Sequence, residues 1–181
     1  MPESSNPNWR GGRFVASNGY VMVLAHGHPR AHIIDDSYDW PLPNVHLGVT
    51  IESAAHIDRA DILQDTPAAV RWISAEPLLG PLVERCATCA AGTVQIGAEA
   101  FMDCPDCRGT GWSGLDLTGI DTIVIGGESG PHARPMELRW LTDLVDAADA
   151  AGCAVYVKQD SGRAGQQGRI PDELWRRKEL P

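Results

Sequence analysis

Two closely spaced cysteine pairs constrain the fold of this chain more than any other feature. The pairs read CATC at residues 86–89 and CPDC at residues 104–107, with fourteen residues between them. A two-residue gap lets both sulfurs of a pair face one point on a tight turn, and two such pairs complete the tetrahedral thiolate shell that zinc prefers. The sequence therefore predicts one zinc site with four ligands: Cys86, Cys89, Cys104 and Cys107.

Other states of these four cysteines are two disulfides, four free thiols or an iron–sulfur cluster. The N-terminal residues MPESSNPNWRGGR lack the apolar core of a signal peptide, so we expect the chain in the cytoplasm of the host cell, where thiols stay reduced. Paired turns on a hairpin favour zinc over a cluster. All four ligand positions are filled by protein, which predicts a structural zinc. Cys153 is expected to be a buried thiol outside the site.

A second feature is a repeated sequence pattern: a short β-branched apolar run, then a polar cluster, then a helical or irregular stretch. The apolar runs lie at residues 45–51, 70–75, 122–125 and 153–157. Such runs predict parallel strands buried on both faces. A helix is predicted between Pro135 and Gly152, and a weaker one over residues 53–64. The fold class is therefore α/β, with right-handed parallel crossovers.

Both cysteine pairs lie in a stretch that interrupts this pattern. Residues 77–121 are about forty residues, whereas a strand-to-helix connection usually has about 2 to 6. We predict an inserted zinc hairpin over residues 81–116. Gly92, Gly109 and Gly111 relieve the backbone where it curls behind each pair, and the module resembles the zinc knuckles of chaperones.

Polar side chains follow each predicted strand at its end. They are Glu52, Glu76, Glu128, Ser129, Lys158 and Gln159. Because ligands of parallel α/β folds bind at the carboxyl ends of the strands, these residues are a candidate ligand rim. The alternative is that the acids cap helices or pair with bases such as Lys158 and Arg134.

Composition limits the partners. The 181 residues suffice for one domain with small attachments, and no apolar run approaches the roughly 20 residues that cross a bilayer. The net charge of −9 opposes binding to phosphate backbones. Two short basic runs, Arg10 with Arg13 and residues 176–178, are interpreted as solvated surface. We therefore expect neither membrane nor nucleic acid as a partner.

Residues 40–181 resemble a phage-encoded family of uncharacterised proteins distantly related to radical S-adenosylmethionine enzymes. The matching segments are WPLPNVHLGVTIES, TPAAVRWISAEPLLGP, IDTIVIGGESGPHARPM, AGCAVYVKQ and the terminal GRIPDELW with KELP. The resemblance implies a partial parallel (βα) barrel of about four to five strands. In that family a cysteine-rich segment at the first barrel strand would hold an iron–sulfur cluster, but here no cysteine precedes Cys86. We therefore expect neither the cluster nor S-adenosylmethionine in this chain alone. Activity is expected to need a second polypeptide that supplies the missing segment, or a homodimer.

Residues 6–32, NPNWRGGRFVASNGYVMVLAHGHPRAH, resemble the start of phage HNH homing endonucleases. The catalytic motif of such nucleases lies further downstream, and the histidines of this chain lack its ββα spacing. These histidines are His26, His28, His32 and His46. We predict an N-terminal arm and β-hairpin over residues 1–36, without nuclease activity, joined to the partial barrel over residues 37–181. The hairpin near residues 20–25, or a dimer, is expected to cover the free sheet edge.

Three functional hypotheses follow. The first is a barrel-derived protein of unknown function that is inactive alone or needs a second chain. The second is a zinc-containing module that binds protein or nucleic acid. The third is a remnant HNH endonuclease. The acidic total and the lack of aromatic residues among basic ones disfavour nucleic acid as the ligand of the second.

Overall fold

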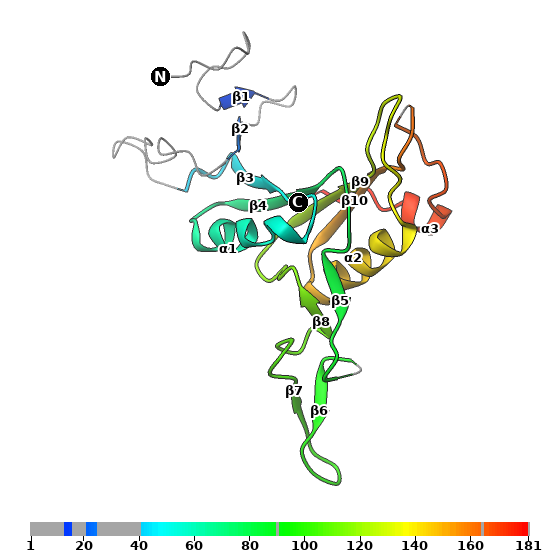
Figure 1. Cartoon of the computed structure of the whole chain (residues 1–181). Coiled ribbons are helices and arrows are strands. Elements are labelled where there is room, and N and C mark those ends of the chain that lie inside the picture. Colours follow the sequence, from blue (N-terminus) through cyan, green and yellow to red (C-terminus); the bar gives the residue numbers. More distant parts are fainter. Residues whose placement is uncertain (1–12, 16–20, 25–40, 90, 164, 181) are drawn as a thin grey trace.

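A single β-sheet organises the described part of the chain. The computed structural model describes residues 13–15, 21–24, 41–89, 91–163 and 165–180. Among them, six strands form a sheet in the order β1-β2-β3-β4-β9-β10 (Figure 1). The strands are β1 (Arg13–Val15), β2 (Val21–Leu24), β3 (Val45–Thr50), β4 (Val70–Ala75), β9 (Thr122–Gly126) and β10 (Ala154–Gln159). β1 runs antiparallel to β2, and the other neighbouring pairs are parallel. The four predicted strands are confirmed as β3, β4, β9 and β10.

Helices lie between β3 and β4 and between β9 and β10, and a short helix follows β10. The helices are η1 (Ala54–His56), α1 (Asp58–Asp65), α2 (Leu138–Ala151) and α3 (Asp172–Trp175). The predicted weak helix is divided into η1 and α1, and the predicted strong helix is confirmed as α2. Gly152 ends α2 in a left-handed conformation, with φ of 71°, and its N–H donates to the carbonyls of the last turn. No helix in the described residues is long and apolar enough to cross a membrane.

The two faces of the sheet differ in burial. Alternate residues such as Leu47, Ile73 and Ile123 are at most 4% exposed and share one core with Leu63 of α1 and Leu144 of α2. On the opposite face, the residues of β3, β4 and β10 include half-buried ones: His46, Thr50, Trp72, Ser74 and Tyr156. The prediction of strands buried on both faces is therefore wrong for these three strands, because polar residues alternate with the apolar ones. It holds better for β9, where only Val124 is half-buried.

Segments of the same chain pair with both ends of the parallel array. On one side β2 pairs with β3, which confirms that a segment within residues 20–25 covers this edge. On the other side the C-terminal residues run along β10: the N–H of Val157 donates to the carbonyl of Arg177, and that of Glu179 donates to Val155, both at 2.9 Å. On the first side β1 is then the edge strand of the sheet, whereas on the second side the C-terminal residues cover part of the edge of β10.

The residues predicted as an inserted zinc hairpin form two small antiparallel sheets outside the main sheet. At the base, β5 (Val83–Arg85) pairs with β8 (Trp112–Gly114). At the tip, β6 (Thr93–Gln95) pairs with β7 (Phe101–Asp103). Figure 1 shows this hairpin projecting away from the main sheet. Val83 and Trp112 belong to the main core, so the base is anchored in the body of the protein.

Replacing Gly48 by alanine is expected to lower the free energy of unfolding. Gly48 lies directly opposite Trp72 on β4, and a Cβ at Gly48 would lie 2.2 Å from the indole Nε1. Displacing the indole should cost about 1–3 kcal/mol, the usual range for overpacking. Urea unfolding would measure the loss, with Gly80→Ala as control, because a Cβ there meets no heavy atom within 4 Å. Equal losses in the two variants would contradict this packing.

Candidate metal centre and the carboxyl edge of the sheet

The four predicted ligands converge between the base and the tip of the hairpin. Their Sγ atoms all lie within 4.8 Å of one another. The Sγ atoms of Cys86 and Cys104 are 3.8 Å apart, and those of Cys89 and Cys107 are 3.4 Å apart. Zn–S bonds of about 2.3 Å in a tetrahedron place the sulfurs about 3.8 Å apart. The cluster thus has the dimensions of a site for one tetrahedral ion.

The distances between the sulfurs disfavour both disulfides and an iron–sulfur cluster. All five cysteines of the chain are free thiols, so the alternative of two disulfides is not observed. An iron–sulfur cluster binds its cysteines through different iron atoms, which spreads the sulfurs farther apart than the ligands of one ion. The compact arrangement therefore favours a single ion.

Glycines shape the backbone around the cysteines. Gly92 has a φ of 87°, and its carbonyl accepts a hydrogen bond from the N–H of Cys104 at 2.6 Å. A Cβ at Gly92 would lie 2.0 Å from the carbonyl oxygen of Gly109, so a side chain cannot be placed there without moving the backbone. The N–H of Gly111 donates to Cys107 Sγ at 3.2 Å. The two cysteine turns are thus held against each other by main-chain contacts.

The thiols of Cys89 and Cys107 differ in acidity. Burial, together with the neighbouring Cys107 and Cys86 thiols, raises the pKa of Cys89 to about 12. Burial opposes ionisation of Cys107 as well, but the N–H of Gly111 and the neighbouring thiols outweigh it and lower its pKa to about 7. Metal binding requires thiolates, so it must release the protons that these sulfurs hold.

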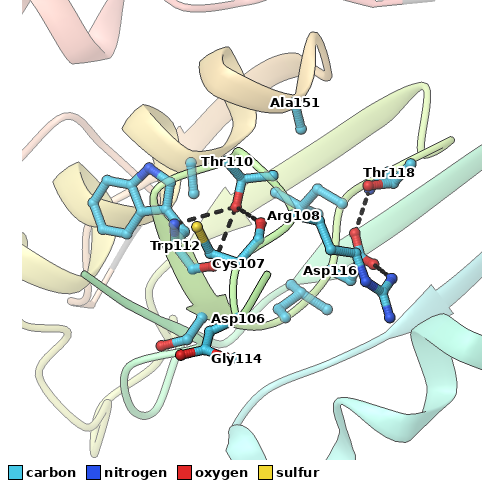
Figure 2. Close-up of a pocket in the computed structure, with 13 residues that line it drawn as sticks. Asp106, Cys107, Arg108, Thr110, Trp112, Gly114, Asp116, Thr118 and Ala151 are labelled. Carbon is cyan, nitrogen blue, oxygen red and sulfur yellow. Dashed lines mark hydrogen bonds and ion pairs between the residues drawn. The ribbon is translucent and has the colours of Figure 1, made fainter. Parts of the chain in front are cut away.

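A cavity of about 190 Å³ lies where the base of the hairpin meets α2 (Figure 2). Its wall includes Thr110, whose hydroxyl donates to the carbonyl of Cys107 at 2.7 Å and accepts from the N–H of Trp112 at 3.2 Å. On the other side, Arg108 pairs with Asp116 at 3.0 Å. These polar groups bind one another, so the loop that joins the cysteines to the body is held by internal hydrogen bonds.

At the carboxyl edge of the main sheet, three of the predicted rim residues come together. Lys158 Nζ donates to Glu76 Oε2 at 2.9 Å, and Gln159 Nε2 donates to the carbonyl of Gly127 at 2.9 Å. Glu76 and Gln159 also flank Gly126, since a Cβ there would lie 3.4 Å from both side chains. Glu76, Lys158 and Gln159 therefore form one polar group beside a glycine backbone.

The remaining rim residues have local partners. Arg59 lies 3.4 Å from Glu52 Oε2. Arg134 binds both oxygens of Glu128, at 2.8 and 2.9 Å. Ser129 forms a parallel bridge with the loop that follows β10. Each acidic residue of the rim thus pairs with a base of the same chain, which is the alternative that the sequence left open.

Replacing Arg134 by glutamine should raise the pKa of Glu128. Hydrogen bonds from the side chain and N–H of Arg134 lower the pKa of Glu128 to about 2. Without the guanidinium, we expect this pKa to rise toward the ordinary value of about 4.3, while the backbone N–H of residue 134 still holds it somewhat below that value. Titration of the carboxyl carbon of Glu128 by NMR would measure both values. The Arg139→Gln variant is the control, since Arg139 pairs instead with Asp143. A wild-type pKa near the ordinary value would contradict the two-oxygen pairing.

The sequence did not reveal an ion pair beside the rim that involves a buried aspartate. The side chain of Asp160 is 3% exposed. It accepts hydrogen bonds from Nε, Nη2 and the backbone N–H of Arg169, at 2.8 to 2.9 Å. Burial opposes ionisation of Asp160, but these bonds prevail and lower its pKa. The available signal was that Asp160 directly follows the strand run that ends in VKQ.

The other residues weighed from the sequence fall into two groups. Arg10 and three of the histidines, His26, His28 and His32, lie outside the described residues. The C-terminal basic run is engaged within the chain. Arg177 pairs with Asp149 at 2.6 Å, and Lys178 Nζ lies 3.6 Å from the centre of the Trp175 ring. The Arg176 side chain is 78% exposed, as expected of solvated surface, whereas the Arg177 side chain is only 24% exposed and is held against the body of the protein.

Fold and site together define a mixed α/β protein with a candidate four-cysteine metal centre. Residues 16–175 match the family model described as a protein of unknown function, DUF5131, and the chain belongs to this family. No curated protein and no solved structure matches the chain. The match agrees with the predicted uncharacterised family, and it includes part of the segment predicted as an N-terminal arm, residues 1–36. The phage, radical S-adenosylmethionine and HNH resemblances stay predictions.

Proposed function

We propose that the chain binds one zinc ion through its four clustered cysteines and that this ion is structural. The observation that carries the proposal is the approach of all four Sγ atoms to within 4.8 Å. Four protein ligands complete a tetrahedron, so no position remains for a catalytic water. The ion would stabilise a hairpin that lacks a core of its own, because every residue of β7 is exposed and β6 buries none. Metal binding worth on the order of 10 kcal/mol is enough to fold such a segment.

Metal analysis of the purified full chain tests this proposal. We expect about one zinc per chain and only traces of iron. Acid-labile sulfide, which iron–sulfur clusters release, should be absent. Two or more iron atoms per chain together with sulfide would overturn the zinc assignment.

We also propose that the parallel sheet is related to the (βα) barrels of radical S-adenosylmethionine enzymes. In doubly wound sheets the strand order reverses at a switch point, whereas in (βα) barrels each strand lies beside the next one along the chain. Here β2, β3, β4, β9 and β10 are neighbours in chain order without reversal. This order and the resemblance of residues 40–181 support the relationship.

The residues present do not fit the iron–sulfur cluster of that enzyme class. Four of the five cysteines form the compact single-ion site, which leaves Cys153. Cys153 is 3% exposed at the start of β10, and burial raises its pKa to about 12. One buried thiol cannot hold a cluster that requires several thiolates. We therefore assign no radical step to this chain alone and propose that such chemistry would need a second polypeptide.

A further inference from the structure

The tip of the zinc hairpin exposes an unusual amount of apolar surface. The tip consists of β6, β7 and the turn between them, residues 93–103. Ile96 is 62% exposed, Phe101 63% and Met102 47%. In the described part of the chain, the other large apolar side chains with high exposure are Ile62 and Leu180. Large exposed apolar side chains thus gather at the tip.

Strand pairing places two of these side chains, Ile96 and Met102, on one face. Val94 lies opposite Met102, and the N–H of Ile96 donates to the carbonyl of Ala100 at 2.9 Å, which continues the same register. Directly opposed residues of antiparallel strands share a face, and so do residues two apart. Val94, Ile96, Ala100 and Met102 therefore form one apolar face, the tip face. Val94 packs against the cysteines, so this face begins at the metal centre.

The outer part of the tip face does little for the fold of this chain. Ile96 and Met102 belong to neither of the two hydrophobic clusters, and both are largely exposed. Contiguous exposed apolar surface on a soluble protein marks an interaction site. Methionine is also enriched at the centres of protein interfaces. A hairpin held by a metal would present this face in a fixed conformation, which lowers the entropic cost of binding.

The charge of the hairpin indicates which kind of partner could bind the tip face. Residues 86–107 contain Glu99, Asp103 and Asp106 but no lysine, arginine or histidine. A zinc ion with four thiolates adds further negative charge. A nucleic acid or a second copy of this tip would meet repulsion, whereas lysine and arginine side chains would be attracted. We propose that the tip face docks a partner protein that presents apolar side chains flanked by lysine or arginine.

A phage-displayed random peptide library panned on the zinc-loaded full chain tests this proposal. The Ile96→Ser/Met102→Ser double variant serves for counter-selection, and Ile62→Ser on α1 is the matched control. We expect the enriched peptides to combine apolar residues with lysine or arginine. By fluorescence anisotropy, the selected peptide should bind the double variant at least about tenfold more weakly than wild type. It should bind the Ile62→Ser variant with unchanged affinity.

A second variant tests the contribution of charge. Glu99→Lys leaves the tip face intact and reverses one exposed charge, so it should weaken the same peptide several-fold. Added salt should weaken it in wild type too, because exposed charges are screened. Peptides that are acidic, or that bind the double variant equally well, would overturn the proposal. The proposal would also be overturned if sedimentation velocity showed that the wild-type chain self-associates and that the double variant does not. Zinc content is measured on each variant. A variant that binds the peptide weakly but keeps its zinc has lost the docking face, whereas one without zinc has lost the metal site.

Discussion

Replacing Cys104 by serine is expected to remove the zinc ion and unfold residues 86–111, while the main sheet stays folded. Cys104 is fully buried among the other three ligands, and its Sγ lies 3.8 Å from that of Cys86. Loss of a residue that only hydrogen-bonds to a metal ligand lowers metal affinity by up to roughly a hundredfold. Loss of a direct ligand should lower zinc affinity by more than this. The tip would then lack the interaction that stabilises it, whereas the base keeps Val83 and Trp112 in the main core.

Two measurements check this result. The zinc content found by metal analysis should fall from about one ion per chain to nearly none, because a four-thiolate site requires all four ligands. Hydrogen exchange should show lost protection at the amide of residue 104, which donates to Gly92 in the wild type, while the amides of β9 and β10 remain protected. Cys153→Ala is the matched control, since Cys153 is buried outside the site and should keep the zinc. Stoichiometric zinc in the Cys104→Ser protein would contradict the assignment.

Replacing Asp160 by asparagine is expected to lower the free energy of unfolding by about 2–4 kcal/mol. Removing one partner of a wholly buried pair costs about 3–5 kcal/mol, and the value here is lower because the Arg169 side chain is 53% exposed. Asp160 also accepts from the N–H of Ser161, and Arg169 donates to the carbonyl of Met136. The pair thus ties the loop after β10 to the segment before α2.

The effect of Asp160→Asn should depend on pH in a defined direction. The folded-state pKa of Asp160 is lowered by Arg169, so its contribution is fully present above the ordinary aspartate pKa of about 3.9. The contribution is lost as the pH falls toward the lower folded-state pKa. Urea unfolding at pH values from about 6 down to about 3 should therefore show a shrinking difference between wild type and variant.

An exposed pair supplies the control for this prediction. Asp143→Asn removes the partner of Arg139, whose side chain is 86% exposed, and should cost less than about 0.5 kcal/mol. A loss at Asp160 no larger than this, or a difference that grows toward low pH, would show that the buried pair does not stabilise the loop.

Features that depend on local sequence were predicted well. The β-branched runs that became β3, β4, β9 and β10 carry their own strand signal. Gly152 ends α2 because the left-handed conformation there favours glycine. The convergence of the cysteines followed from their spacing, since each CxxC turn brings its two sulfurs together and the metal-binding pattern requires both turns.

Features that depend on contacts between distant residues could not be predicted. Asp160 and Arg169 are linked through the fold of their loop, and nothing in the residues between them marks the pair. Lys158 reaches Glu76 across 82 positions of the chain, so the sequence allowed both a ligand rim and an internal pair. The tip face required the strand register, which places Val94 opposite Met102. The half-buried state of the second face of the sheet likewise depends on which elements pack against it.

X-ray absorption at the zinc K-edge of the purified full chain tests the metal centre most directly. Four thiolate ligands on one ion predict a single shell of four sulfurs at about 2.3 Å, with no nitrogen or oxygen neighbours. The same sample should show no short metal–metal distance, because four Sγ atoms within 4.8 Å of one another have room for one ion. A mixed shell with nitrogen or oxygen ligands, or a metal–metal vector, would contradict the structural zinc site.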